Sequence, residues 1–327
     1  MMTKVFSRVK RFLPLVGIIL FFYTIYILDI SDIIDAFLSV DLLILLLAIP
    51  LTIPRVLIRN YAWKCISDEQ QIDISYKGLL SVFLMGYFYG TITPGYLGQL
   101  MRIPYLKERT DEPYGKLFFN SSIETIIHTM SLYIMMFFGA LIVIGSYPEL
   151  FTITTVWLIS LSFVLFLFIR RNRGEYIFNA LIQYFIPRSV KTHMHDFADT
   201  FYKDFPRISK LLFPLFIGTF TWILIYTQYY CIVYALDLDI PYLYFLLLMP
   251  VANLAAFIPI TFAGLGIREF TAVILFTTLF SVSDEKIFVV SLLGFIITDL
   301  LTGFAGFLIA LKDSGRGIFE KSSNFSI

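Results

Sequence analysis

The sequence predicts an all-α polytopic membrane protein, and three observations lead to this fold class. First, 58% of the 327 residues are hydrophobic and only 15% are charged, against about 25% charged in a typical soluble domain. Second, the apolar residues gather into runs of the length that a membrane helix needs. Third, basic residues concentrate in some connections between those runs and avoid others. This composition excludes an ordinary soluble enzyme, a disordered chain and a nucleic-acid-binding protein.

Six apolar runs approach or exceed the roughly 20 residues that a spanning helix needs. They are Phe12–Leu28, Leu42–Ile58, Leu117–Ile144, Leu150–Ile169, Leu211–Leu236 and Ile287–Leu311. No small-residue cleavage site follows the first run, so we expect a retained helix rather than a signal peptide. Two further apolar regions are interrupted, residues 78–106 at Pro94-Gly95 and residues 242–280 at Ala263-Gly264. The expected fold therefore has six spanning helices plus two broken or re-entrant helical hairpins, about eight membrane segments.

Basic residues orient these segments, because cytoplasmic connections carry an excess of Lys and Arg. The basic segments are residues 4–11, 59–77, 102–116 and 170–208. Residues 29–41, in contrast, hold four Asp and no basic residue. We therefore expect both termini and the loop 170–208 in the cytoplasm. Region 78–106 should enter from the cytoplasm and return there, and region 242–280 should enter and return from outside or cross twice.

The two interruptions resemble each other at an offset of 168 residues. Residues 92–98 read ITPGYLG and residues 260–266 read ITFAGLG, so Ile, Thr, Leu and Gly match. The same offset carries the second and third apolar runs onto residues 210–226 and 285–312, which are also apolar. We therefore predict one transmembrane domain over residues 1–327, built as an inverted repeat with halves at about 12–144 and 150–311. Inverted repeats with broken helices are typical of transporters.

The interruptions supply the first candidate substrate-binding residues. Irregular backbone at membrane depth is tolerated only where it is buried in protein or lines a wet cavity. A helix that restarts after each break directs free N–H groups toward the membrane interior, where they can bind an anion such as a phosphate. An arginine follows each break. The candidates are Thr93, Gly95, Arg102, Thr261, Gly264, Gly266, Arg268 and Glu269. The alternative is that the glycines allow tight packing and the arginines extend to the interface.

Three further polar residues lie inside apolar runs. Glu124 and His128 are spaced i,i+4 and so share one helical face, and Asp299 is alone in the last run. Ionisable residues in membrane segments are costly and are functional candidates by default. Glu124 and His128 could bind substrate, relay a proton, or pair with Arg102 or Arg268. The alternative for all three is a structural polar contact between helices.

Other polar residues have simpler interpretations. Arg55 and Arg59, at the inner end of the second run, are expected to be interfacial anchors. His193 and His195 lie in a basic polar loop with no fourth ligand nearby, so no metal site is expected. No nucleotide-binding loop or catalytic serine motif is present in the sequence, and no cofactor is predicted.

The residues around the two interruptions resemble those of the lysylphosphatidylglycerol synthase transmembrane family, also called the flippase-like domain. The family element Pro-Gly-x-x-Gly-Glu-x-x-Arg is similar to residues 94–102, PGYLGQLMR, where Gln99 replaces the Glu. A second element, ending in Gly-x-Arg-Glu, is similar to residues 259–269, PITFAGLGIRE. The resemblance covers about residues 10–311. It implies a membrane domain for polar lipids, which in some relatives is fused to a phosphatidylglycerol aminoacylating domain or attached to a glycosyltransferase. Gln99 puts a proton or cation role at that position in doubt, and Asp299 stands where a basic residue is expected nearby.

The expected function is movement of a polar phospho- or isoprenoid-phosphate lipid between leaflets of the cell membrane. No synthase domain follows in this sequence, so we expect no enzyme activity. The expected partner is a membrane lipid with an anionic head group, together with a separate synthase or glycosyltransferase, and no nucleic acid. Two alternatives stay open: a lipid-binding accessory subunit of such an enzyme, and an intramembrane enzyme that uses Glu124 and His128 as acid and base.

Overall fold

The computed structural model describes residues 17–168, 173–174, 176, 200–201, 203–254 and 261–323. Within these residues the secondary structure is helical, apart from one isolated antiparallel pair, Pro94 and Phe262. The chain divides into two compact units. Unit 1 takes the described parts of residues 1–54, 80–101 and 225–327, and unit 2 takes those of residues 55–79 and 102–224. The predicted single domain with two repeat halves stays a prediction.

Five of the six predicted spanning helices are confirmed as helices long and apolar enough to cross a membrane. These five stretches are Leu42–Glu69, Tyr114–Ile142, Pro148–Leu167, Ile208–Ala235 and Asp284–Asp313. The first comprises α3 (Leu42–Ala48), a 3-10 turn (Ile49–Leu51) and α4 (Thr52–Glu69). The next three are α7 (Tyr114–Ile142), α8 (Pro148–Phe168) and α11 (Ile208–Ala235). The last comprises α14 (Asp284–Phe295), a π-helical turn (Ile296–Leu300) and the first part of α15 (Leu301–Ser323). The protein is therefore a polytopic helical membrane protein.

The sixth predicted span differs from a straight helix. Its described part, Gly17–Leu28, is followed by α2 (Ile30–Leu38) after a bend of 85°, and the two are long and apolar enough only as a pair. The acidic segment 29–41, predicted as a connection, is thus largely helical. Its aspartates explain this correction, because Asp29 accepts a hydrogen bond from the Ser31 amide at 3.0 Å and caps α2.

Both predicted interruptions are breaks in helical structure. In the first, α5 (Tyr76–Thr91) ends before a 3-10 turn (Leu97–Met101) and α6 (Arg102–Arg109). In the second, α12 (Tyr242–Leu254) precedes α13 (Ile267–Phe280), and residues 255–260 lie outside the described chain. With 16 residues, α5 is about 24 Å long, which is short of a hydrocarbon core of roughly 30 Å.

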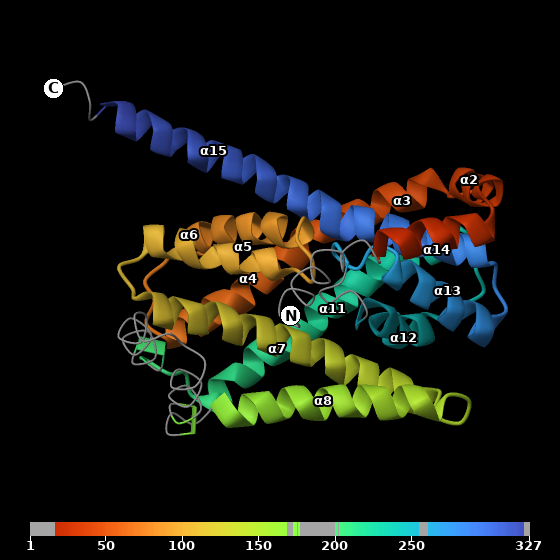
Figure 1. The fold of residues 1–327 in the computed structure, drawn as a ribbon, viewed down its shortest axis with the longest axis horizontal. Helices are drawn as coiled ribbons and strands as arrows, with labels where there is room; N and C mark the ends of the chain where they lie inside the picture. Colours follow the sequence, from red (N-terminus) through yellow and green to blue (C-terminus); the bar gives the residue numbers. More distant parts are fainter. Residues whose placement is uncertain are drawn as a thin grey trace, which may run out of the picture. The chain divides into compact units, whose positions relative to one another are not determined.

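Unit 1 is held by close helix contacts. Helix α13 packs on α12 and α14, and α14 also packs on α2 (Figure 1). Gly306 of α15 lies against the backbone of Leu84 in α5, where a Cβ atom would overlap the Leu84 carbonyl. The Gln228 amide of α11 donates to the Ala48 carbonyl at 3.1 Å and to the Thr52 hydroxyl at 2.8 Å. Small residues and buried amides are typical of packing between membrane helices.

Unit 2 is organised around α7. Helix α8 runs beside it as a hairpin and α6 also packs on it (Figure 1). The apolar core here is formed by Ile66, Phe119, Ile123, Ile127, Phe201 and Leu211. Polar contacts fix neighbouring helices: Trp63 of α4 donates to Asn120 at 2.8 Å, and Ser131 donates to the Leu215 carbonyl of α11 at 2.8 Å. Most of the predicted loop 170–208, including His193 and His195, lies outside the described residues.

Candidate functional site

The sequence-predicted residues fall into two clusters, one in each unit. We call the first the break site: residues 93–98, residues 261–269, Tyr87 and Asp299, all in unit 1. We call the second the Glu124 cluster: Arg59, Arg102, Glu124 and His128, all in unit 2. Because the predicted arginines Arg102 and Arg268 belong to different units, a shared lipid cavity between them stays a prediction.

At the break site the two interruptions meet through their backbones. The Gly95 amide donates to the Thr261 carbonyl at 3.2 Å, and Pro94 pairs with Phe262 in antiparallel orientation. Pro94 and Phe262 are also equivalent residues at the repeat offset of 168. An antiparallel pair formed by two equivalent residues has the local geometry of a two-fold axis passing between them.

The backbone conformation repeats at the same offset. Positive φ values occur at Gly95 (58°), Tyr96 (57°), Ala263 (47°) and Gly264 (81°). The turn that follows also repeats, since Leu97 donates to the Pro94 carbonyl at 3.3 Å and Leu265 donates to the Phe262 carbonyl at 2.9 Å. Left-handed conformations cost free energy in residues other than glycine. Tyr96 and Ala263 are therefore strained positions that the surrounding packing maintains.

The side chain of Thr93 stabilises the turn of the first interruption through hydrogen bonds. Its hydroxyl donates to the Tyr89 carbonyl at 2.8 Å and accepts from the Gly98 amide at 2.6 Å. Thr261, its equivalent, is fully buried. The predicted residues Thr93, Gly95, Thr261 and Gly264 are thus backbone-shaping residues of the break site.

The N-terminus of α13 is occupied by a carboxylate of the protein itself. Gly266 has a φ of 87°, and its amide donates to Glu269 at 2.6 Å. Arg268 pairs with the same carboxylate through Nη2 at 2.5 Å and Nε at 3.1 Å, and Arg268 and Glu269 are 1% and 0% exposed. The Arg268 guanidinium also lies over the Phe295 ring at 4.4 Å. A phosphate at this helix end would therefore compete with Glu269 for its donors.

Asp299 joins the break site from the π-helical turn. Its carboxylate accepts hydrogen bonds from the Tyr87 hydroxyl at 2.7 Å and the Tyr96 hydroxyl at 3.3 Å. Tyr96 also reaches the Ala263 carbonyl at 3.5 Å, as does Nη1 of Arg268. π-helical turns inside α-helices occur frequently at functional sites. The half-buried Asp299 is therefore a candidate functional carboxylate of the break site.

The Glu124 cluster is built on α7, α4 and α6. Glu124 is 3% exposed and accepts hydrogen bonds from Nη1 of Arg102 at 2.7 Å and from Nε of Arg59 at 3.2 Å. Arg102 also donates to Thr125 at 2.8 Å and lies over the Trp63 ring at 4.9 Å. Pairing with Arg102, one of the alternatives left open for Glu124, is present in the structure. The interpretation of Arg59 as an interfacial anchor is wrong, since its guanidinium is paired with a buried carboxylate.

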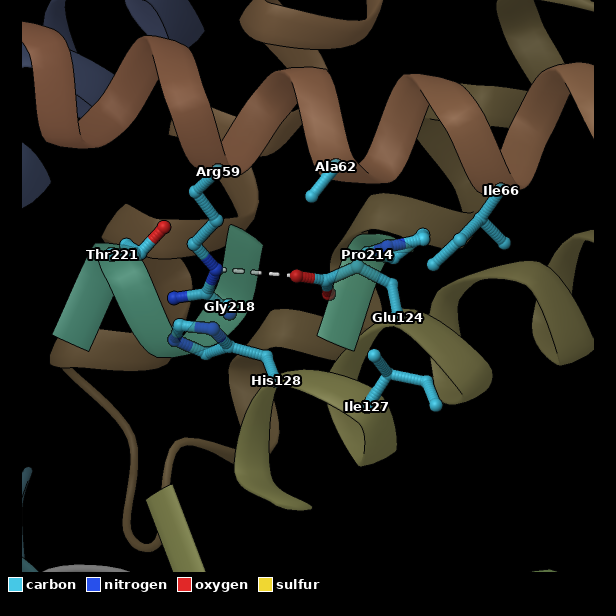
Figure 2. Close-up of a pocket in the computed structure, with 9 residues that line it drawn as sticks. All are labelled: Arg59, Ala62, Ile66, Glu124, Ile127, His128, Pro214, Gly218 and Thr221. Atoms are coloured by element: carbon cyan, nitrogen blue, oxygen red, sulfur yellow. Dashed lines mark hydrogen bonds and ion pairs between the residues drawn. The ribbon is translucent and has the colours of Figure 1, made fainter. Parts of the chain in front are cut away.

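His128 lies one turn further along α7, beside a small pocket that Arg59, Glu124 and Thr221 also line (Figure 2). Its ring stacks on Trp222 of α11, with centroids 4.6 Å apart and an angle of 14° between the planes. The Trp222 indole N–H donates to the His128 carbonyl at 2.9 Å. These contacts fix the ring with its edge toward the pocket.

Sequence reasoning missed three important partners. Tyr87 and Tyr96 hold Asp299, and Trp222 holds His128. The chain has 20 Tyr, so composition gave no reason to select these two. Tyr96 could have been selected, because it lies inside the first interruption next to Gly95.

Comparison with protein families agrees with the membrane architecture. Comparison with curated proteins finds no match. The family model described as the lysylphosphatidylglycerol synthase TM region matches residues 12–306, which include both interruptions and the Glu124 cluster. The match extends over most of the 327 residues, and the chain belongs to this membrane-domain family.

Proposed function

We propose that this protein moves a polar phospho- or isoprenoid-phosphate lipid between the two leaflets of the cell membrane. The head group passes along polar groups inside the protein while the acyl or isoprenoid chains stay in the bilayer. The observation that carries the proposal is the break site, where two interrupted helices meet among buried charged side chains. Backbone of this kind belongs at membrane depth only when protein buries it or it lines a polar path.

The local symmetry of the break site supports an inverted repeat. Pro94 and Phe262 are equivalent residues and pair antiparallel, and the left-handed conformations recur at equivalent positions. Transporters with inverted repeats place their substrate sites near the bilayer midplane, where discontinuous helices of the two halves meet. At the break site, the interruptions of the two proposed halves likewise contact each other.

The proposed topology has six spans and two re-entrant hairpins, about eight membrane segments, with both termini cytoplasmic. The shortness of α5, about 24 Å, supports a hairpin that returns to its own side. In this topology region 242–280 enters from the outside, opposite to region 78–106, and both breaks reach a similar depth.

The proposed partner is a membrane lipid with an anionic head group, supplied by a separate synthase or glycosyltransferase. We propose transport rather than catalysis, because the Glu124 carboxylate is engaged by two guanidiniums. That arrangement suits a fixed charge better than a group that gives and takes protons during a reaction.

Lipid movement by the purified protein tests the proposal. Full-length protein is reconstituted into liposomes with phosphatidylglycerol that carries a fluorescent label on its head group, and dithionite is added outside. Vesicles with protein should lose the label of both leaflets, whereas protein-free vesicles lose only the outer one. The variant Asp299→Asn keeps the shape of the side chain and removes its charge, and we expect slower loss. If vesicles with well-folded protein behave like protein-free vesicles, the transport proposal is wrong.

A further inference from the structure

We propose that α2 is an interfacial helix, which lies in the surface of the bilayer with a stripe of apolar side chains inserted among the lipids. We call Ile30, Ile34 and Leu38 the α2 stripe. Its partner is the lipid surface itself, and the inference goes beyond the proposed function because it does not depend on lipid movement. The proposed topology decides only the side of the membrane, since it places residues 29–41 outside.

The direction of α2 is the first observation. The chain bends by 85° between the apolar helix Gly17–Leu28 and α2, and the stretch that follows α2, Leu42–Glu69, is long and apolar enough to cross a membrane. Spanning helices tilt from the bilayer normal by only about 20° on average. A helix at nearly a right angle to such a helix therefore runs close to the plane of the membrane.

The exposed apolar side chains are the second observation. Successive residues are about 100° apart around a helix, so the spacing i, i+4 and i+8 places the α2 stripe on one face. Ile30, Ile34 and Leu38 are 62%, 50% and 78% exposed. The packing of α2 on α14 does not cover them, because the buried residues of α2 are Ile33 and Ala36, on another face (Figure 1). Interfacial helices bury such an apolar face about 5–10 Å into the boundary between head groups and acyl chains.

The polar face of α2 is the third observation, and it indicates that the helix does not enter the hydrocarbon core. Ser31, Asp32 and Asp35 are exposed on this face, while Asp29 and Asp41 cap α2 and α3. Residues 29–41 contain no basic residue that could pair with these carboxylates. Charged side chains are costly in hydrocarbon, so the polar face belongs in water.

The sign of the charge shows which force holds α2 at the membrane. Basic amphipathic helices are attracted to anionic lipids in addition to burying apolar side chains. The carboxylates of Asp32 and Asp35 gain no such attraction. Burial of the α2 stripe among lipids is therefore the interaction that places this helix in the surface.

Spin labels on single cysteines test where α2 lies. The full-length protein, with its two native cysteines replaced by Ser, is reconstituted into phosphatidylcholine liposomes. Oxygen concentrates in lipid and a nickel chelate stays in water, so each relaxes the label according to its surroundings. Ile34→Cys and Leu38→Cys should be relaxed more by oxygen than by the chelate, and Asp32→Cys and Asp35→Cys more by the chelate. All four positions are exposed, so each variant should keep the elution profile of the wild type.

Two control positions in unit 1 fix the scale of the measurement. Ile53→Cys changes an exposed side chain near the middle of the stretch Leu42–Glu69 and reports lipid. Asp239→Cys changes an exposed side chain in the acidic connection 236–241 and reports water. The ratio of oxygen to chelate relaxation at Ile34 should lie closer to the ratio at Ile53 than to the ratio at Asp239, and the ratio at Asp35 should lie closer to that at Asp239.

Three results would overturn the proposal. Strong relaxation by the chelate at all four positions would place α2 in water above the bilayer. Protection of Asp32 and Asp35 from the chelate, together with the α2 stripe, would make α2 part of a broken span. Protection of the stripe from both reagents would mean that protein, such as a second copy of this chain, covers it. The expected pattern supports the interfacial helix whether or not the same liposomes show lipid movement, so the proposed function stands or fails separately.

Discussion

At the scale of single residues, the two buried carboxylates Glu124 and Glu269 are held in different ways. Glu269 has one arginine, Arg268, and one backbone donor at the start of α13. Glu124 has two arginines, which come from α4 and α6. A buried ion pair contributes little net stability, but removal of one partner leaves an uncompensated buried charge. Removal of Arg268 should therefore destabilise the fold more than removal of either Arg59 or Arg102.

We predict that Arg268→Ala lowers the free energy of unfolding by roughly 3–5 kcal/mol, because Glu269 then stays buried and charged. Arg268→Lys should lose less, since it keeps the charge but not the forked geometry. The double variant Arg268→Met, Glu269→Gln removes both charges, and its new amide oxygen can still accept from the Gly266 amide, so it should recover most of the loss. Denaturant unfolding in detergent, followed by circular dichroism, measures this series. A double variant that is no more stable than Arg268→Ala would contradict the buried-pair explanation.

At the scale of elements, the breaks show what sequence could predict and what it could not. Glycine and proline punctuation predicted both interruptions, because these residues end helices for reasons of backbone geometry. Apolar runs predicted the five long helices, because burial in lipid is decided by composition. The helix α2 was missed, since Asp29, which caps α2, and Asp41, which caps α3, were interpreted as parts of an acidic loop. The role of Arg59 was also missed, because pairing with Glu124 depends on tertiary packing that no sequence spacing encodes.

Close approach of α15 and α5 gives a prediction at the same scale. A Cβ atom on Gly306 would overlap the Leu84 carbonyl, so Gly306→Ala should lower the free energy of unfolding by about 1–3 kcal/mol. Gly145 has nothing within 4 Å of the equivalent position, and Gly145→Ala should change stability by less than about 0.5 kcal/mol. Retention of the folded elution peak after graded heating compares the two. An equal loss of stability in both variants would mean that the close contact between α15 and α5 at Gly306 does not stabilise the fold.

At the scale of the whole molecule, the orientation in the bilayer is the property that connects sequence and proposed function. The alternation of basic and acidic connections predicts which ends of the helices face the cytoplasm. The break site fits an inverted repeat only if regions 78–106 and 242–280 enter the membrane from opposite sides. Orientation is therefore the large-scale property to measure.

Cysteine labelling measures it directly. With Cys65 and Cys231 replaced by Ser, single cysteines are introduced at Asp32, Asp73, Asp111 and Asp239, which are all exposed. An impermeant thiol reagent added to intact cells should label positions 32 and 239, and should label positions 73 and 111 only after the membrane is opened. External labelling at position 111 together with protection at position 73 would show that region 78–106 crosses the membrane, and the proposed inverted arrangement would be wrong.

The interleaving of the two units has a consequence for how the protein is made. Unit 1 is assembled from the beginning, the middle and the end of the chain. Thr52 receives its hydrogen bond from Gln228, a residue 176 positions later, so at ordinary synthesis rates it waits roughly 10 to 35 s for that partner. During this interval the first helices are already in the bilayer with polar groups still unmatched. Unit 1 therefore completes its folding only after much of unit 2 has left the ribosome, and mutations late in the chain should act on the stability of its earliest helices.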